Sequence, residues 1–329
     1  MRILVTGATG FLGGQTALRL CQDGHSVRAT GRSEVAKSLK QRNIEFHKVA
    51  LDKENLSGLL ENIDAVVHCA AKSSPWGSYE SFYASNVEAT RRLCQAALAH
   101  KVKCFVHIST PGLYFNFQDK HHLKEEDIIA NNKTNFYIQT KYQAEEIVQE
   151  YVKLGLHAII LRPRAIFGPG DRALLPRLLS VGQKRFIPQM RVDRGPLCDL
   201  TYVDNVVFAI RQALHSSVPS GSVYNITNDE PVYLLDVLKK VFESLNIPWR
   251  TRKIPYKLAV GYAYLLEKIY SCFLRGKEPP FTTYTISLLA KDMTLDIQKA
   301  KKELGYVAQV NMSDALTYTL QAYKNEHTT

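Results

Sequence analysis

The sequence predicts an α/β fold with a doubly wound parallel sheet and a smaller, interleaved C-terminal lobe. Two observations support this prediction. A short apolar strand at the N-terminus runs into three spaced glycines and then into a helical pattern. Further apolar strands alternate with amphipathic stretches of helical length as far as residue 161. This alternation is typical of parallel sheets, because each strand needs a crossover helix to reach the next strand.

The opening stretch predicts a turn that binds the phosphates of a dinucleotide. Strand residues Ile3 to Val5 are followed by Gly7, Gly10 and Gly13. Gly7 permits a tight turn, Gly10 lets the backbone approach a pyrophosphate, and Gly13 lets the helix pack on the strand. The first helical turn adds free N–H groups and the positive end of its dipole. An ordinary glycine-rich turn is the alternative. A Rossmann fold is expected, with the cofactor contacting Gly7, Thr9, Gly10, Phe11, Leu12 and Gly13.

Composition limits the kind of protein and its compartment. The net charge of +11 suits an anionic cofactor, an anionic substrate or acidic lipid, and the basic residues are too dispersed for nucleic acid. The six cysteines form no Cys-x-x-Cys pair, so we expect neither a metal site nor disulfides. With no signal peptide and no apolar span near ~20 residues, we expect a reducing, cytoplasmic protein.

The length predicts two units. Because 329 residues exceed the usual size of one hydrophobic core, we expect an NAD(P)-binding domain over 1–170 and a substrate-binding lobe over 171–329. No low-complexity linker separates them, so some segments of the second unit should return to the first. The start of the second unit is basic and suits an anionic carboxylate or thioester substrate, through Arg172, Arg177, Lys184, Arg185, Arg191 and Arg194.

The ends of the second and third strands predict how the adenosine half of the cofactor is held. Ser26 to Thr30 is a strand that leads to Arg32, where an acidic residue would select NAD(H). Arg32 can pair with a 2′-phosphate, so we prefer NADP(H) and keep NAD(H) as possible; Arg32 stacking beside the adenine is the alternative. The third strand, Ile44 to Leu51, leads to Asp52. We expect Leu51 and Asp52 at the adenine, although Asp52 could instead cap a helix near Glu54.

The fourth strand, Ala65 to Cys69, brings a second set of residues to the cofactor. The small Ala70 and Ala71, followed by Lys72, should lie beside it, and His68 is a core histidine. Trp76, in the next loop, is either a wall of the substrate pocket or a packing anchor. Asn86 is predicted to open a helix that runs through His100, where it caps the helix or braces the site.

Three residues predict an acid–base site. The fifth strand, Phe105 to Ile108, ends in Ser109 and Thr110, and a later helix carries Tyr137 and Lys141 on one face. We expect Lys141 to lower the pKa of Tyr137, so that the phenol can exchange a proton with a substrate oxygen. Thr110 would hydrogen-bond the same oxygen, and Ser109 and Lys141 would also contact the cofactor. The alternative is that Tyr137 and Lys141 are only a salt-bridging pair on the surface of the helix.

Two later stretches complete the predicted site and its surroundings. After the sixth strand, Ala158 to Leu161, we expect Pro163 and Ile166 at the cofactor and Arg164 in the substrate pocket, together with Gly112 from the loop after the fifth strand. Residues 255–274 form a helical stretch with a broad apolar face that is too charged to span a bilayer. Three interpretations stay open for it: a lid over an apolar substrate, an interfacial anchor, or ordinary core.

The motifs in this order resemble an extended short-chain dehydrogenase/reductase over almost the whole chain. Within that superfamily the chain resembles the 3β-hydroxysteroid dehydrogenase-like branch, and most closely the bacterial 2-alkyl-3-oxoalkanoate reductases of long-chain olefin biosynthesis. The matching stretches include Gly7-x-x-Gly10-x-x-Gly13, Trp76-Gly77-Ser78-Tyr79, Ser109-Thr110, Tyr137-x-x-x-Lys141, Arg162-Pro163, Phe167-Gly168-Pro169-Gly170-Asp171 and Glu278-Pro279-Pro280-Phe281.

The resemblance implies roles and partners. Tyr137 would be the acid/base, Lys141 its partner and Thr110 the donor to the substrate oxygen. The substrate would be a long acyl or sterol-like molecule whose 3-oxo and 3-hydroxy groups interconvert. A homodimer through the helices after strands four and five is implied, and contact with a membrane surface or with pathway enzymes is possible. A nucleotide-sugar epimerase or dehydratase with bound NAD, and a non-catalytic NADP(H) sensor, are the alternatives.

Overall fold

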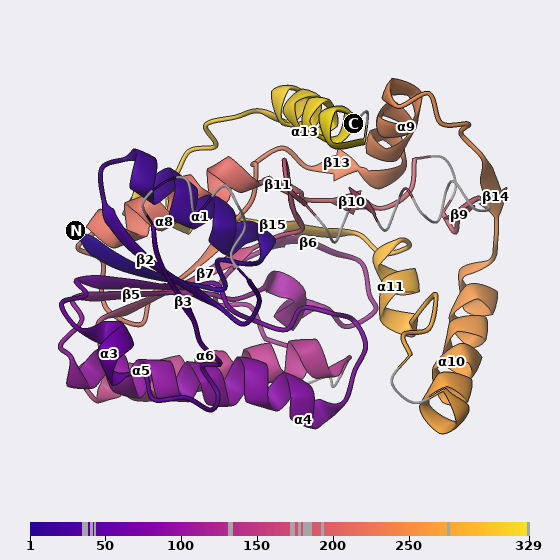
Figure 1. Ribbon diagram of the computed structural model, residues 1–329. Coiled ribbons are helices and arrows are strands. Elements are labelled where there is room, and N and C mark those ends of the chain that lie inside the picture. Colours follow the sequence, from indigo (N-terminus) through magenta and orange to yellow (C-terminus); the bar gives the residue numbers. More distant parts are fainter. Residues whose placement is uncertain are drawn as a thin grey trace.

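The computed structural model describes residues 1–327, apart from 35–38, 40–41, 43, 131–133, 172–174, 177–178, 180–185, 192–193 and 275–276. Its centre is a parallel sheet of seven strands in the order β12-β7-β5-β4-β1-β2-β3 (Figure 1). The strands are β1 (Arg2–Thr6), β2 (Ser26–Gly31), β3 (Glu45–Lys48), β4 (Ala65–His68), β5 (Cys104–Ile108), β7 (Ala158–Pro163) and β12 (Val223–Ile226). The predicted doubly wound fold is therefore confirmed.

Helices cover both faces of this sheet, which explains why its strands are apolar runs without alternation. One hydrophobic core lies under α1 (Phe11–Gln22), α8 (Val203–His215) and α12 (Gln298–Leu304). The other lies under α3 (Ser57–Leu60), α5 (Ala89–Ala99) and α6 (Phe136–Lys153). Because α8, β12 and α12 come from the second half of the chain, that half supplies part of the dinucleotide-binding layer.

The smaller lobe lies beside the carboxyl ends of the strands (Figure 1). Its four-stranded sheet has the order β13-β10-β15-β6, and β6 comes from the first half of the chain. The strands of the whole lobe, including those outside this sheet, are β6 (Lys120–Leu123), β8 (Ile166–Phe167), β9 (Ile187–Gln189), β10 (Leu197–Cys198), β11 (Thr201–Tyr202), β13 (Val232–Tyr233), β14 (Thr251–Lys253) and β15 (Met293–Leu295). The helices are α9 (Leu234–Ser244), α10 (Tyr256–Phe273), α11 (Thr283–Leu288) and α13 (Met312–His327).

Two element predictions were wrong. Asn86 does not open a helix, because α4 (Tyr79–Phe82) begins earlier, is capped by Ser78 and continues through the π-helical turn η1 (Tyr83–Glu88) into α5. Asp52 caps no helix, because α3 starts at Ser57. The contact with the adenine is therefore the interpretation of Asp52 that stays a prediction.

Three further predictions concern the composition of the chain. Arg172, Arg177, Lys184 and Arg185 of the predicted basic stretch lie outside the described residues. All six cysteines are free, and Cys94, Cys104 and Cys198 are buried. Within the described ranges, no helix combines the length and the hydropathy that crossing a bilayer requires.

Candidate active site

The carboxyl ends of four neighbouring strands bring the predicted site residues together. The register pairs Thr6 of β1 with His68 of β4, His68 with His107 of β5, and Ile108 with Leu161 of β7. Residues at or just after the ends of these strands therefore share one edge of the sheet, and they include Gly7, Ala70, Ser109 and Pro163. The chain reverses its winding direction between β1 and β4, which is where this fold class binds its ligands.

The glycine turn after β1 is shaped for a phosphate group. Gly7 has a φ of +71°, and a Cβ on it would lie 2.8 Å from the backbone of Ala70. A Cβ on Gly13 would lie 2.4 Å from the Gly7 carbonyl oxygen, so only glycine lets α1 approach β1 this closely. Helix α1 starts after Gly10, with no side-chain cap and no acidic residue in its first turn. No acidic side chain of its own first turn competes for its free N–H groups and positive dipole end, which suits a pyrophosphate.

The residues predicted at the adenosine lie along the next part of the same edge. Gly31 pairs with Lys48, so the segments after β2 and β3 are neighbours. Arg32 is exposed, and among the described residues its guanidinium hydrogen-bonds to Ser85 alone, with an Nη1–Oγ distance of 3.4 Å. Asp52 is partly buried, whereas the Leu51 side chain packs in the core under the sheet. Arg32 is thus held loosely and is accessible to a charged group.

Thr110 and Tyr137 form the centre of the candidate active site. Asn135 caps α6 by accepting from the N–H of Ile138 at 2.8 Å, and Tyr137 lies in the first turn. The Tyr137 phenol lies next to the side chain of Thr110. Burial raises the pKa of Tyr137 to about 12, the neighbouring phenol of Tyr284 adds to the rise, and Thr110 opposes it. The phenol is therefore protonated throughout the neutral range.

Lys141 lies one helical turn beyond Tyr137 and is directed at β5. Its ammonium donates to the carbonyl of Ile108 at 2.6 Å and to Nε2 of His107 at 3.2 Å. Because lysine has only donors, His107 carries its proton on Nδ1. Burial lowers the pKa of Lys141 to about 8, and Glu145 opposes this shift. The side chain is 2% exposed.

This arrangement corrects the expected coupling between Lys141 and Tyr137. The pKa of the tyrosine is raised and not lowered, and the ammonium is not among the groups that shift it. The reason is geometric: the carbonyl of Ile108 and the ring of His107 hold the ammonium against β5. Thr110 is the residue that favours the phenolate.

Asn86 takes the bracing role that the sequence left open. Its amide oxygen accepts from the N–H of Lys72 at 2.7 Å, and its amide nitrogen donates to the Lys72 carbonyl at 3.1 Å and to Thr140 Oγ1 at 2.9 Å. It thereby joins the loop after β4 to the turn of α6 that carries Tyr137. His68 is a core histidine as predicted, hydrogen-bonded to Thr6 and Thr90.

The residues predicted for the substrate pocket lie around this centre. Gly112 is buried, and its N–H donates to Thr110 Oγ1 at 3.1 Å. Trp76 is partly buried in the loop after β4. Arg164 is 9% exposed, its Nε has no hydrogen-bond partner in the part of the chain described, and its charge acts on Tyr284. Ile166 pairs with Thr201 across β8 and β11.

Sequence reasoning missed Tyr284 and His107. Tyr284 belongs to α11, and no local motif connects it with Tyr137, which is distant in the chain. His107 carried a readable signal, because a polar residue within an apolar strand, next to Ile108 and before Ser109, must find a buried partner.

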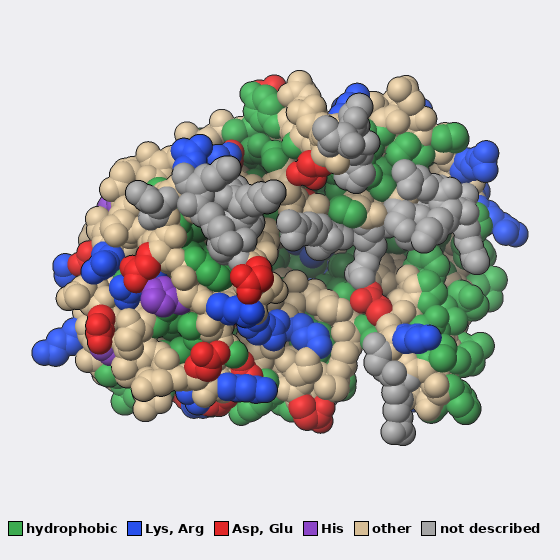
Figure 2. Space-filling view, viewed as in Figure 1, with side chains coloured by type: hydrophobic (Ala, Val, Ile, Leu, Met, Phe, Trp, Pro, Cys, Tyr) green, Lys and Arg blue, Asp and Glu red, His purple; other side chains and the backbone are tan. Residues whose placement is uncertain are grey.

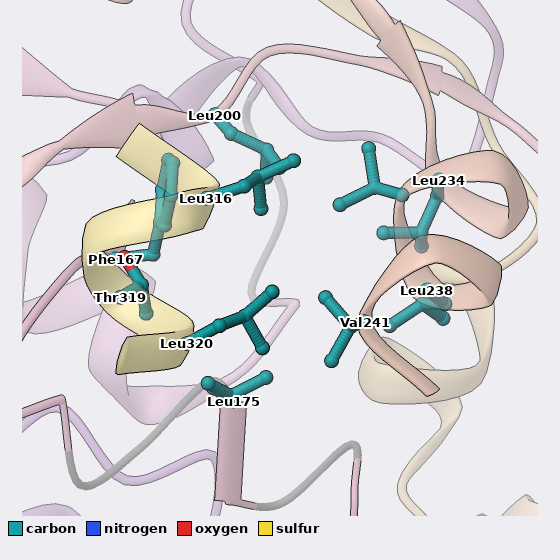
Figure 3. A pocket seen from close by; sticks show the side chains of 10 residues that line it. Phe167, Leu175, Leu200, Leu234, Leu238, Val241, Leu316, Thr319 and Leu320 are labelled. Atoms are coloured by element: carbon teal, nitrogen blue, oxygen red, sulfur yellow. The ribbon is translucent and has the colours of Figure 1, made fainter. Parts of the chain in front are cut away.

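A separate apolar cavity of about 40 Å³ lies in the smaller lobe, away from Tyr137. Figure 3 shows Leu316 and Leu320 of α13 on one side, and Leu234, Leu238 and Val241 of α9 on the other. An apolar cavity of this size has no room for a long-chain substrate, so it is a packing defect between the two helices.

Comparisons with known proteins agree with this geometry. The model of the NAD dependent epimerase/dehydratase family matches residues 3–227. The uncharacterised protein YbjS of Escherichia coli K12 is 36% identical over 336 aligned positions, covering 99% of this chain and 98% of that protein. The 2-alkyl-3-oxoalkanoate reductase of Stenotrophomonas maltophilia is 29% identical, covering 96% and 97%. The sterol-4-alpha-carboxylate 3-dehydrogenase of Candida albicans is 33% identical, covering 78% and 75%.

A solved structure supports the fold in the same way. The UDP-glucuronic acid 4-epimerase of Bacillus cereus, in complex with NAD, superposes with a TM-score of 0.79 at 23% identity, covering 99% of this chain and all of that chain. The family model spans the glycine turn, Thr110, Tyr137 and Lys141. The chain therefore belongs to the NAD dependent epimerase/dehydratase family, the extended short-chain dehydrogenase/reductase group that its motifs predicted.

Proposed function

We propose that the protein is an NADP(H)-dependent oxidoreductase that interconverts a 3-oxo and a 3-hydroxy group on a long-chain acyl or sterol-like substrate. The placement of Tyr137 next to Thr110, at the sheet edge that also carries the turn of Gly7, carries the proposal. The reductase and dehydrogenase relatives, whose names give such substrates, support it. Because Tyr137 and Lys141 are both present, an enzyme is favoured over a non-catalytic sensor.

The same residues would hold the cofactor. The uncapped start of α1 would take the pyrophosphate, and the strand ends at Ala70, Ser109 and Pro163 would border the nicotinamide half. Ser109 Oγ is buried and has no hydrogen-bond partner among the described residues, so it is a free donor and acceptor at that edge. A bound nicotinamide supplies the hydride to the carbonyl carbon.

The protein's own residues supply the proton. As the substrate oxygen gains negative charge, Tyr137 donates its phenolic proton to that oxygen, and the resulting phenolate is protonated again from solvent. Thr110 donates a second hydrogen bond to the same oxygen. Because the pKa of Tyr137 is raised to about 12, the phenol carries its proton throughout the neutral range and is in the donor form when a carbonyl substrate binds.

Substitution of Tyr137 tests the reaction. Purified protein is mixed with NADPH and a long-chain 3-oxo acid, a 3-ketosteroid or a UDP-sugar, and NADPH oxidation is followed by absorbance. We expect turnover with an apolar 3-oxo substrate, and a loss of about 10²–10⁴-fold in kcat for Tyr137→Phe at unchanged NADPH affinity. Tyr142→Phe, an exposed position on the same helix, is the matched control.

Other outcomes would contradict the proposal in distinguishable ways. Bound NAD that survives purification, together with a thermal shift from UDP-sugars alone, would favour the epimerase. Full activity in Tyr137→Phe would remove the phenol from the chemistry. Turnover with none of the carbonyl compounds would overturn the substrate class.

The preference for NADP(H) rests on Arg32, which is exposed and weakly held. A guanidinium there can form charge-assisted hydrogen bonds with a 2′-phosphate, so Arg32→Ala should weaken NADPH binding about tenfold. NADH binding should be unchanged in the same variant. Fluorescence titration measures both affinities, with Arg91→Ala as the control. An unaltered ratio of NADPH to NADH affinity would show that Arg32 does not bind the 2′-phosphate.

The family resemblance also implies that the protein forms a homodimer. We propose a homodimer through η1, α5 and α6, the helices after β4 and β5. Tyr83 and Phe136 on these elements are 36% and 44% exposed, which supports an apolar contact. Sedimentation velocity tests it, because Phe136→Glu should shift a dimer toward monomer.

A further inference from the structure

Helix α10 presents an exposed apolar stripe. Leu258, Tyr262, Leu265, Ile269 and Phe273 are 68%, 56%, 55%, 38% and 82% exposed. They follow one another at intervals of four and three residues, so they share one side of the helix. Exposed large side chains usually occur singly on protein surfaces, whereas a contiguous stripe marks an interaction surface.

The opposite side of α10 is already packed, which orients the stripe away from the protein. Ala259 and Ala263 are the buried residues of the helix, and they pack with Ile286 of α11. Figure 1 places α10 at the outer edge of the smaller lobe, and Figure 2 shows hydrophobic side chains along that edge. Of the three interpretations that the sequence allowed, ordinary core is therefore wrong.

The charges around the stripe identify what it can dock on. Residues 250–278 contain seven Lys or Arg and only two acidic residues, Glu267 and Glu278. Glu267 accepts from the N–H and the hydroxyl of Thr283, at 2.8 and 3.1 Å. Glu278 accepts from Ser74 Oγ at 3.3 Å. Both carboxylates are thus engaged within the protein, and the surroundings of α10 are strongly basic.

A second copy of this chain fits the stripe poorly. Two copies joined along α10 would bring the basic residues of both together, including Lys257 and Lys268 of each, while the two carboxylates of that stretch, Glu267 and Glu278, are already engaged within the protein. An anionic surface has the complementary charge. Tyr262 and Tyr264, each 56% exposed, have an apolar ring and a polar hydroxyl, a combination enriched at bilayer–water interfaces.

We propose that α10 docks on the surface of an anionic lipid bilayer. The stripe enters the headgroup region, and the surrounding lysines and arginines contact lipid phosphates, as in other interfacial helices. The docked helix adjoins the candidate active site, because α11 follows it and carries Tyr284, the neighbour of Tyr137. The Glu278–Ser74 contact also joins this region to the loop of Trp76. An apolar substrate could then enter from the membrane; this route rests on the proposed function, whereas docking itself does not.

Vesicle flotation with the full chain tests the docking. The vesicles contain phosphatidylcholine alone or phosphatidylcholine with phosphatidylglycerol, at low and at high salt. We expect flotation with the anionic vesicles only, weakened by salt. Lys257→Gln with Lys268→Gln should weaken it about fivefold for each charge removed. Leu265→Ser with Ile269→Ser should abolish it, while Ile128→Ser, at an exposed apolar position far along the chain, should not change it.

Each outcome decides between docking on lipid and its rivals. Circular dichroism and NADPH binding establish that the variants fold, and sedimentation velocity measures their association. Absence of flotation with anionic vesicles at low salt, or equal flotation of the stripe variant, overturns the proposal. A stripe variant that changes only the oligomeric state shows that a second copy covers α10. Loss of flotation with unchanged turnover of a soluble 3-oxo substrate supports docking and leaves the proposed chemistry intact.

Discussion

Lys141 is the residue whose charge state should limit the reaction at high pH. Its pKa is lowered from 10.5 to about 8 by burial, whereas the pKa of Tyr137 is raised to about 12. Between the two values the phenol keeps its proton, while the lysine loses the charge with which we expect it to hold the cofactor. We therefore expect kcat to fall above pH 8, and a profile of kcat against pH measures it. Lys141→Arg cannot deprotonate, so its residual activity should show no decline near pH 8.

The same shift has a consequence for stability, with a definite sign. The unfolded chain binds the proton of Lys141 more tightly than the folded chain, because the pKa is about 8 when folded and 10.5 when unfolded. Over that interval the unfolded state holds more protons, so this group makes stability rise with pH. Below pH 8 its unfavourable contribution is fully present. Urea midpoints of the wild type and Lys141→Arg at several pH values isolate this contribution, and a wild-type midpoint that falls relative to the variant would contradict it.

At the scale of single residues, the sequence predicted which residues belong to the site better than it predicted which groups they contact. Thr110 and Tyr137 could be identified because each follows a recognisable strand end or helical spacing. The partners of Lys141 could not, since the Ile108 carbonyl is a backbone group and His107 lies on a different element. Tyr284 reaches Tyr137 only through tertiary packing.

At the scale of elements, the cavity between α9 and α13 predicts a stabilising substitution. Val241 is 3% exposed and borders the cavity of about 40 Å³, which has room for one more methyl group. Val241→Ile should stabilise the protein by roughly 1 kcal/mol, since it buries that group without opening space elsewhere. Val206→Ile is the matched control, because Val206 is fully buried in the close-packed core beneath α8 and should be destabilised. Denaturant unfolding measures both, and a loss of stability in Val241→Ile would contradict the cavity argument.

The strands of the large sheet were predictable, whereas the short strands of the smaller lobe were not. The strands at Ala158, Val223 and their neighbours are apolar runs bounded by turn residues, and their pattern is local. The strands β8, β10, β11 and β13 have two residues each, too short for any periodicity. The start of the helix at Tyr79 was missed because a π-helical turn breaks the 3.6-residue period before Asn86.

At the scale of the whole molecule, the two halves of the chain depend on each other. Residues 1–170 supply six strands of the central sheet, but α8, α12 and β12 from later in the chain cover one face and one edge. Ala209, Ile210 and Ala213 of α8 are completely buried there. In return, β6 from the first half pairs with β15 of the smaller lobe, in register at Met293 and Lys120.

This interdependence predicts that residues 1–170 do not fold cooperatively alone. Without α8 and α12, the face of the sheet that includes Val106 and Ile159 is exposed to water, an apolar area too large for a stable monomer. Thermal unfolding followed by circular dichroism should show no sigmoidal transition for 1–170 and one transition for the full chain. A chain of residues 1–227 keeps α8 and β12 and should recover part of the cooperativity. If 1–170 unfolds as sharply as the full chain, α8 and α12 are not required for the sheet to fold, and the first half is an independent domain.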